Sequence, residues 1–160
     1  MPGARILLVE DDEVLCELIL RNLEIRGHDV RIAEDAQAAL AHLRTAPFDL
    51  TILDINLPDQ TGWEVLRTAQ KEGRLSPLQL NGNAGQLPVV VLSAVRVSPS
   101  RLQEFHPLAY LPKPFPMDAI LRLASEAASR RNGEIVAETS DDAEAGSSGI
   151  ALPYEEDLYA

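Results

Sequence analysis

Residues 49–66, DLTILDINLPDQTGWEVL, decide the fold class of this 160-residue chain. The aliphatic and β-branched run from Leu50 to Leu53 is typical of a strand buried on both faces of a parallel sheet. Asp54 follows this run directly, and a helical pattern extends from about Gly62 to Lys71. A buried strand, a short polar loop and a helix in this order form the building unit of α/β folds.

The same alternation extends outward on both sides of this stretch. Four further runs are predicted strands, namely Arg5 to Val9, Asp29 to Ala33, Val89 to Leu92 and Ala109 to Leu111. The other predicted helices are Glu13 to Arg26, Ala36 to Arg44, a short helix that begins at the N-cap Ser98 and is ended by Pro107, and Met117 to Arg131. The sequence therefore predicts a single α/β domain with a doubly wound, five-stranded parallel sheet.

Two segments fall outside this alternation. Residues 72–87, rich in Gly, Asn, Pro and Leu, make a long connection before the fourth strand, and we interpret them as an inserted loop. Residues 133–160 hold 8 of the 25 acidic residues and none of the 14 basic ones, which predicts a disordered acidic tail. The folded domain is expected over residues 1–132, where 14 bases and 17 acids leave a net charge of −3, against −11 for the chain.

Charge and hydropathy exclude several classes of protein. Because no basic cluster occurs, direct contact with nucleic acid is not expected. The longest aliphatic runs, Ile6 to Val9 and Val89 to Leu92, are far shorter than the roughly 20 residues of a membrane span, and the N-terminus lacks the apolar region of a signal peptide. Cys16 is the single cysteine, so no internal disulfide can form and we expect a reducing, cytoplasmic compartment.

Polar side chains follow the predicted strands at the points where the strands end. Glu10 and Asp11 follow the first strand, Asp54 the third, Ser93 the fourth and Lys113 the fifth. Because the carboxyl ends of parallel strands meet at one edge of the sheet, these groups are expected to gather there. No glycine-rich turn follows the first strand, so a phosphate would be repelled by the acids unless a divalent cation intervened. Oxygen ligands suit Mg²⁺ or Mn²⁺, and the pattern indicates a site for a metal and a phosphoryl group together.

Each of these residues also has a purely structural interpretation when it is taken alone. Asp11 or Asp12 can cap the first helix, Ser93 can be a turn hydroxyl, and Lys113 can be a surface cation. Asp54 is harder to explain in this way, because an acid that ends a buried run costs free energy unless charged partners compensate it. The joint spacing favours the functional interpretation.

Four strings carry a resemblance to a known family: ILLVEDDE at 6–13, DLTILDINLPDQTGWEVL at 49–66, VVVLSA at 89–94 and YLPKPF at 110–115. In this order they resemble the response-regulator receiver domain of two-component signalling, from about Ala4 to Arg131. The resemblance implies a flavodoxin-like fold that takes a phosphoryl group from a histidine kinase or a histidine phosphotransfer protein. It also implies slow autodephosphorylation without enzymatic turnover, and signalling to a downstream protein.

Carried over residue by residue, the resemblance implies a role for each member of the set. Asp54 matches the phospho-acceptor, and Lys113 matches the lysine that pairs with a phosphoryl oxygen. Glu10 and Asp11 match the acids that hold Mg²⁺ beside Asp54, and Asn56 would offer its backbone carbonyl to the metal.

A second group would form the conformational switch. Ser93 matches the hydroxyl that closes on the phosphorylated aspartate. Tyr110 matches the aromatic residue whose rotamer reports that closure. The resemblance also implies a cis peptide bond between Lys113 and Pro114.

The chain departs from the family pattern at residues 72–87 and in the shortened stretch from Ser93 to Lys113. The latter alters the face of the fourth helix and fifth strand where many relatives dimerise, so the usual dimer is a weaker expectation here. These departures leave a second interpretation open, a pseudo-receiver that binds proteins independently of phosphorylation. An Asp-nucleophile phosphohydrolase is disfavoured, since Asn56 stands where that class would need a second acid. The sequence allows either a stand-alone receiver or one cut from a longer protein.

Overall fold

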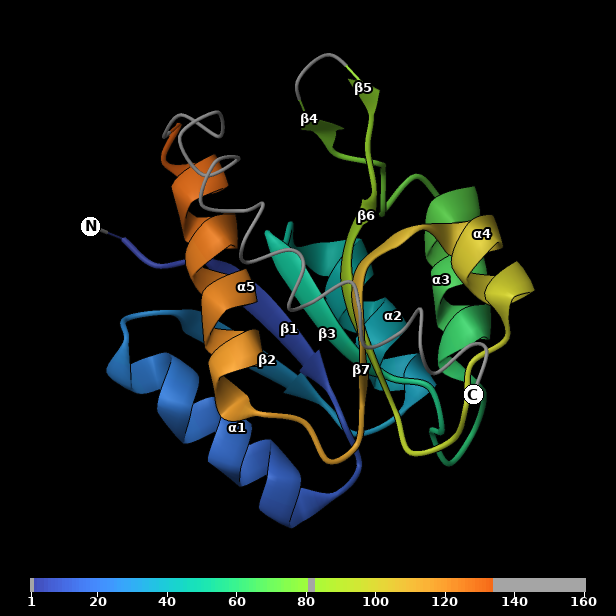
Figure 1. The fold of residues 1–160 in the computed structure, drawn as a ribbon, viewed down its shortest axis with the longest axis horizontal. Coiled ribbons are helices and arrows are strands. Elements are labelled where there is room, and N and C mark those ends of the chain that lie inside the picture. The colour runs from blue at the N-terminus through green and yellow to red at the C-terminus, as the bar shows by residue number, and fades with distance from the viewer. Residues whose placement is uncertain (1, 81–82, 134–160) are drawn as a thin grey trace.

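The computed structural model describes residues 2–80 and 83–133, and a sheet of five parallel strands lies at its centre (Figure 1). These strands are β1 (Arg5–Val9), β2 (Asp29–Ala33), β3 (Leu50–Asp54), β6 (Leu87–Ser93) and β7 (Pro107–Pro112). They lie in the order β2-β1-β3-β6-β7, and every neighbouring pair is parallel. The doubly wound, flavodoxin-like fold predicted from the sequence is confirmed.

Helices cover both faces of this sheet. In the described part of the chain they are α1 (Glu13–Ile25), α2 (Ala36–Thr45), α3 (Gly62–Lys71), α4 (Pro99–Phe105) and α5 (Met117–Arg131). Figure 1 shows α1 and α5 together on one side of the sheet and α2 and α3 on the other, and each pair is in contact. None of the helices within residues 2–80 and 83–133 has the length and apolar character needed to cross a membrane.

Successive side chains of each buried strand point to opposite faces of the sheet, so the core has two layers. In β1, Leu7 and Val9 belong to the apolar cluster that includes residues of α2 and α3, whereas Ile6 and Leu8 belong to the cluster that includes residues of α1 and α5. All four side chains are fully buried. Each contributes about 1.5–3 kcal/mol of hydrophobic stabilisation, which explains why the first strand is a continuous apolar run.

The short helix α4 is fastened to α3 by aromatic side chains. Trp63 of α3 stacks on Phe105 of α4 with ring centroids 5.4 Å apart and an interplanar angle of 19°. The Arg67 guanidinium lies 5.6 Å from the centroid of the Phe105 ring. His106, in the left-handed conformation with φ 49°, ends the helix. Ser98 occupies the N-cap position as predicted, but its side chain makes no capping hydrogen bond.

The segment interpreted as an inserted loop contains a small hairpin. Its two strands, β4 (Gln79–Leu80) and β5 (Asn83–Ala84), are antiparallel, and the Leu78 amide donates to the Gln86 carbonyl at 2.9 Å at the base. Leu75 anchors the approach to the hairpin in the core. Figure 1 places this hairpin beyond the end of the sheet at which the strands begin, far from their carboxyl ends. The predicted tail at 133–160 lies outside the described residues, apart from Gly133.

His28 makes the stability of this fold dependent on pH. Its Nδ1 accepts a hydrogen bond from the Ala4 amide at 2.9 Å, which requires an unprotonated Nδ1, and burial together with the charge of Arg26 lowers the pKa of His28. As pH falls through about 6.5, the unfolded chain binds a proton that the folded chain does not. The contribution of His28 to the free energy of unfolding therefore decreases as pH falls below about 6.5, and urea denaturation measures it as the difference between the parent and a His28 variant.

A pair of variants checks this assignment. The unfolding free energy of the parent relative to His28→Gln should decrease as pH falls below about 6.5. The pH dependence of the parent should persist in a variant of the exposed His106, His106→Asn, which keeps a residue that tolerates positive φ. A difference between the parent and His28→Gln that stays constant across this range would contradict the role of His28.

Candidate functional site

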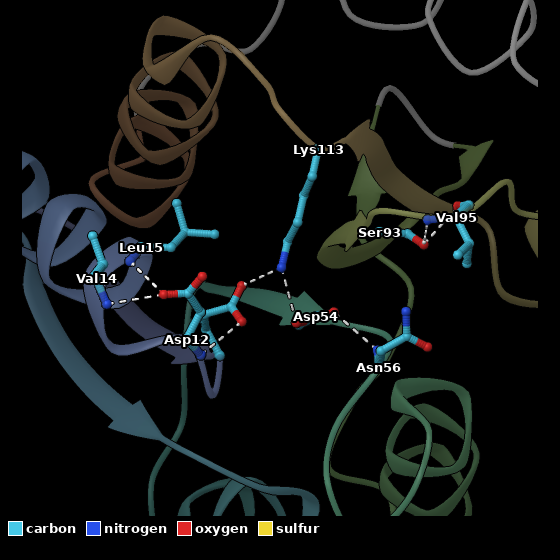
Figure 2. A network of polar contacts seen from close by, with 9 residues as sticks. Asp12, Val14, Leu15, Asp54, Asn56, Ser93, Val95 and Lys113 are labelled. Atoms are coloured by element: carbon cyan, nitrogen blue, oxygen red, sulfur yellow. Dashed lines mark hydrogen bonds and ion pairs between the residues drawn. The ribbon is translucent and has the colours of Figure 1, made fainter.

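The polar groups predicted to gather at the carboxyl edge of the sheet do so. The order of the strands reverses between β1 and β3, and in open α/β sheets this reversal opens a crevice beyond the carboxyl ends of the strands. Glu10 and Asp11 follow β1, and Asp54 is the last residue of β3. Lys113 follows β7 and extends toward Asp54 in Figure 2. The topology of the sheet thus brings together residues that are as much as 103 positions apart.

Three carboxylates form a cluster within this crevice. One carboxylate oxygen from each of Glu10, Asp11 and Asp54 lies within 4.8 Å of the other two. Glu10 is 1% exposed and Asp54 is 4% exposed, while Asp11 faces solvent. Three acidic oxygens at this spacing fit the ligand chemistry of Mg²⁺ or Mn²⁺, which take carboxylates and retain several waters. The exposed position of Asp11 leaves one side of the cluster open to solvent.

Lys113 joins the two buried acids of the cluster. Its Nζ donates to Glu10 Oε1 at 2.8 Å and to Asp54 Oδ2 at 3.0 Å. Burial opposes the charge of the lysine, but the hydrogen bonds with the two acids outweigh this effect and raise the pKa of Lys113. Burial, reinforced by the nearby Asp54, raises the pKa of Glu10 to about 7. The cluster therefore holds more acid than its single cation compensates, which favours a divalent ion in the crevice.

Asp54 is held by the loop that follows it as well as by Lys113. The Asn56 amide donates to Asp54 Oδ1 at 3.0 Å, so both carboxylate oxygens accept a hydrogen bond. The Gly62 amide donates to the Ile55 carbonyl at 2.8 Å, which closes the base of the loop. Asn56 lies directly beside the acid cluster, and the predicted role of its carbonyl as a metal ligand stays a prediction.

Gly62 is required where the loop closes over Asp54. A Cβ atom at this position would lie 2.8 Å from the Asp54 carbonyl oxygen and 3.0 Å from Ile55 Cα. Because both are backbone atoms, the loop would have to shift, and we expect Gly62→Ala to reduce the free energy of unfolding by about 1–3 kcal/mol. Urea denaturation provides the measurement. Gln60→Ala, an exposed change in the same loop, should stay within about 0.5 kcal/mol of the parent, and equal effects would contradict this account.

The predicted switch residues meet at one backbone carbonyl. The buried Ser93 hydroxyl donates to the Val95 carbonyl at 2.7 Å and accepts from the Val95 amide at 3.1 Å. The Tyr110 hydroxyl donates to the same carbonyl at 3.2 Å. In Figure 2 the Ser93 side chain is turned toward Val95 and away from Asp54. Sequence reasoning could not find this shared acceptor, because a backbone carbonyl has no residue signature.

Asp12 has the structural role that the sequence left open. Its Oδ1 accepts hydrogen bonds from the Val14 amide at 3.0 Å and the Leu15 amide at 3.1 Å, so Asp12 caps α1. The Asp12 amide in turn donates to Glu10 Oε2 at 3.2 Å. Asp12 thus orients an acid of the cluster while its own carboxylate is committed to the helix.

Taken together, the fold and its carboxyl edge define a doubly wound α/β domain with a cluster of acids and a lysine suited to a metal and a phosphoryl group. The family model described as the response regulator receiver domain matches residues 6–125. The chain belongs to the response-regulator receiver family.

Individual relatives agree with this assignment. The response regulator MprA of Mycobacterium tuberculosis (strain ATCC 25177 / H37Ra) is 33% identical over 121 residues, which are 74% of this chain and 48% of MprA. The chain thus spans about half the length of the curated relatives it matches.

Solved structures show the same fold. The non-phosphorylated HemR receiver domain from Leptospira biflexa has a TM-score of 0.63 and 32% identity, covering 81% of this chain and 95% of that domain. The response regulator TrrA from Thermotoga maritima, in complex with Mg(2+)-BeF, has a TM-score of 0.61 and 26% identity, covering 79% and 99% of the two chains.

Proposed function

We propose that this domain accepts a phosphoryl group on Asp54 from a histidine kinase or a histidine phosphotransfer protein, with Mg²⁺ as cofactor and Mn²⁺ as a substitute. The observation that carries the proposal is the joining of Glu10 and Asp54 by Lys113 within the three-acid cluster. The TrrA relative, whose structure is in complex with Mg(2+)-BeF, supports the same chemistry.

In the proposed reaction, a carboxylate oxygen of Asp54 attacks the phosphorus atom of a phosphohistidine in line with the leaving nitrogen. The new P–O bond forms as the P–N bond breaks, and the donor leaves as a histidine side chain. Lys113 Nζ, already 3.0 Å from Asp54 Oδ2, orients the acceptor and pairs with a phosphoryl oxygen. A divalent ion held by Glu10, Asp11 and Asp54, with the Asn56 carbonyl, would offset charge on the transferring oxygens.

The signal would be carried by the Ser93 and Tyr110 side chains. To reach a phosphoryl oxygen on Asp54, the Ser93 hydroxyl must leave the Val95 carbonyl, to which it now donates at 2.7 Å. The Tyr110 hydroxyl still donates to the Val95 carbonyl after Ser93 has left it. Because this hydrogen bond joins the two, a movement of the 94–97 segment would change the packing of the Tyr110 side chain. This linkage supports a switch read by a downstream protein.

The wider setting of this function is also part of the proposal. We expect a cytoplasmic protein that contacts a kinase or phosphotransfer protein and a downstream partner, without direct contact with nucleic acid. Water would remove the phosphoryl group slowly, without turnover of a separate substrate, so the domain would not act as an enzyme.

Calorimetric titration with Mg²⁺ and then with beryllium fluoride, a phosphoryl analogue, tests the proposal. We expect saturable binding of Mg²⁺ at one site and binding of the analogue only when Mg²⁺ is present. Asp11→Ala, which removes the exposed ligand, should weaken Mg²⁺ binding by about tenfold or more. Absence of Mg²⁺ binding by the parent protein would favour the pseudo-receiver.

A further inference from the structure

Asp59 lies in the loop between β3 and α3, but its carboxylate binds a different element. Asp59 Oδ1 accepts from the Ala36 amide at 2.9 Å, and Oδ2 accepts from the Gln37 amide at 3.1 Å. These two amides are the first of α2 and have no acceptor within their own helix. The hydrogen bond from the Ala36 amide outweighs the opposing effect of burial and, with the other backbone donors, lowers the pKa of Asp59.

The helix has a cap of its own besides this contact. Asp35, the N-cap residue of α2, accepts from the Ala38 amide at 2.8 Å. Two carboxylates therefore share one helix end, each taking different donors, and only Asp59 comes from the loop beyond Asp54. Asp59 can both stabilise the helix and hold the loop in place, whereas Asp35 can only stabilise the helix. A comparison of the two acids therefore distinguishes these two effects.

The base of the same loop is joined to the phosphoryl-accepting site. Asn56 donates its amide to Asp54 Oδ1 at 3.0 Å and forms a bridge with Thr61, which closes the loop. Asp59 lies at the tip, where its Oδ1 also accepts from the Gln60 amide at 3.0 Å. The loop is thus fixed at its base to Asp54 and at its tip to α2.

We propose that Asp59 is a positioning residue for the site: by fastening the loop tip to the N-terminus of α2, it fixes the Asn56 backbone beside Asp54. A free tip would allow the 55–61 loop to move relative to the acid cluster. Because Asn56 is expected to supply a metal ligand, this movement would weaken binding of Mg²⁺. The expected effect on Mg²⁺ binding rests on the proposed function, whereas the anchoring of the loop by Asp59 does not.

Two matched variants test this role. Asp59→Ala and Asp35→Ala each remove one carboxylate from the same helix end, and both should lower thermal stability. Asp59→Ala should weaken Mg²⁺ binding, measured by calorimetry, about fivefold, whereas Asp35→Ala should stay within about twofold of the parent. In metal-free protein, Asp59→Ala should also accelerate amide hydrogen exchange at Asn56 and Gly62, which a general loss of helix capping would not do selectively.

Each outcome has a definite meaning. Equal Mg²⁺ affinities in the two variants, together with unchanged exchange at Asn56 and Gly62, would overturn the positioning role. If the parent itself fails to bind Mg²⁺, the proposed function fails, and the exchange data still decide whether Asp59 anchors the loop. Asp59→Asn keeps the shape of the side chain and one acceptor oxygen, so its Mg²⁺ affinity should lie between those of the parent and Asp59→Ala. This variant provides the comparison if Asp59→Ala does not fold.

Discussion

Replacement of Asp54 by Asn is expected to abolish phosphoryl uptake from acetyl phosphate, reducing it below about one hundredth of the parent level. The amide is isosteric with the carboxylate but is not a nucleophile toward phosphorus, so no acyl phosphate can form. The substitution also removes a charge from a buried cluster while Lys113 keeps its 2.8 Å hydrogen bond to Glu10. We therefore expect the folded state of Asp54→Asn to be at least as stable as the parent.

The unchanged stability makes the loss of uptake interpretable. Urea denaturation of Asp54→Asn should give a midpoint equal to or above that of the parent. Asp29→Asn, the same change at an exposed aspartate at the start of β2, should keep full uptake. Retained uptake in Asp54→Asn would mean that another residue accepts the phosphoryl group.

Replacement of Lys113 by Met is expected to have opposite effects on stability and metal binding. The change leaves the buried carboxylates of Glu10 and Asp54 without their cation, which should cost about 2–3 kcal/mol of unfolding free energy in the absence of metal. The same loss of a positive charge removes a competitor of the metal, so Mg²⁺ should bind about tenfold more tightly. Phosphoryl uptake should still fall, because no lysine remains to pair with a phosphoryl oxygen.

Three measurements check this combination of effects. Urea denaturation with and without Mg²⁺ gives the stability, calorimetry gives the metal affinity, and initial rates with acetyl phosphate give the uptake. Lys113→Arg, which keeps the charge but changes its geometry, should retain most of the stability while uptake remains impaired. Weaker Mg²⁺ binding in Lys113→Met would contradict the inferred competition between lysine and metal.

The fold could be predicted from the sequence because its central strands are continuous apolar runs. The predicted bounds of β1 and β2 are those observed, and β3 differs only by inclusion of Asp54. The later strands are longer than predicted: β6 begins at Leu87 and β7 at Pro107. The first residues of both strands include a proline, so they do not belong to the continuous aliphatic runs from which the strands were predicted. A proline is nevertheless compatible with the first residues of a strand.

The members of the site could also be predicted, because each follows the end of a strand. What could not be predicted is how backbone groups connect them. The Val95 carbonyl that receives the hydroxyls of Ser93 and Tyr110 has no side-chain signature, and Asp59 has the sequence context of an ordinary turn after Pro58. The two-residue strands of the hairpin at 79–84 are too short to show an alternating pattern.

The central claim is that Asp54 accepts a phosphoryl group within a metal-dependent cluster, and intact mass spectrometry tests it most directly. The parent protein would be incubated with acetyl phosphate and Mg²⁺, beside a chelated sample and the Asp54→Asn variant. We predict a gain of one phosphoryl group per chain in the parent with Mg²⁺ and none in either control. No gain in the parent, also with a phosphohistidine donor, would contradict the claim and favour a module that binds its partners without phosphorylation.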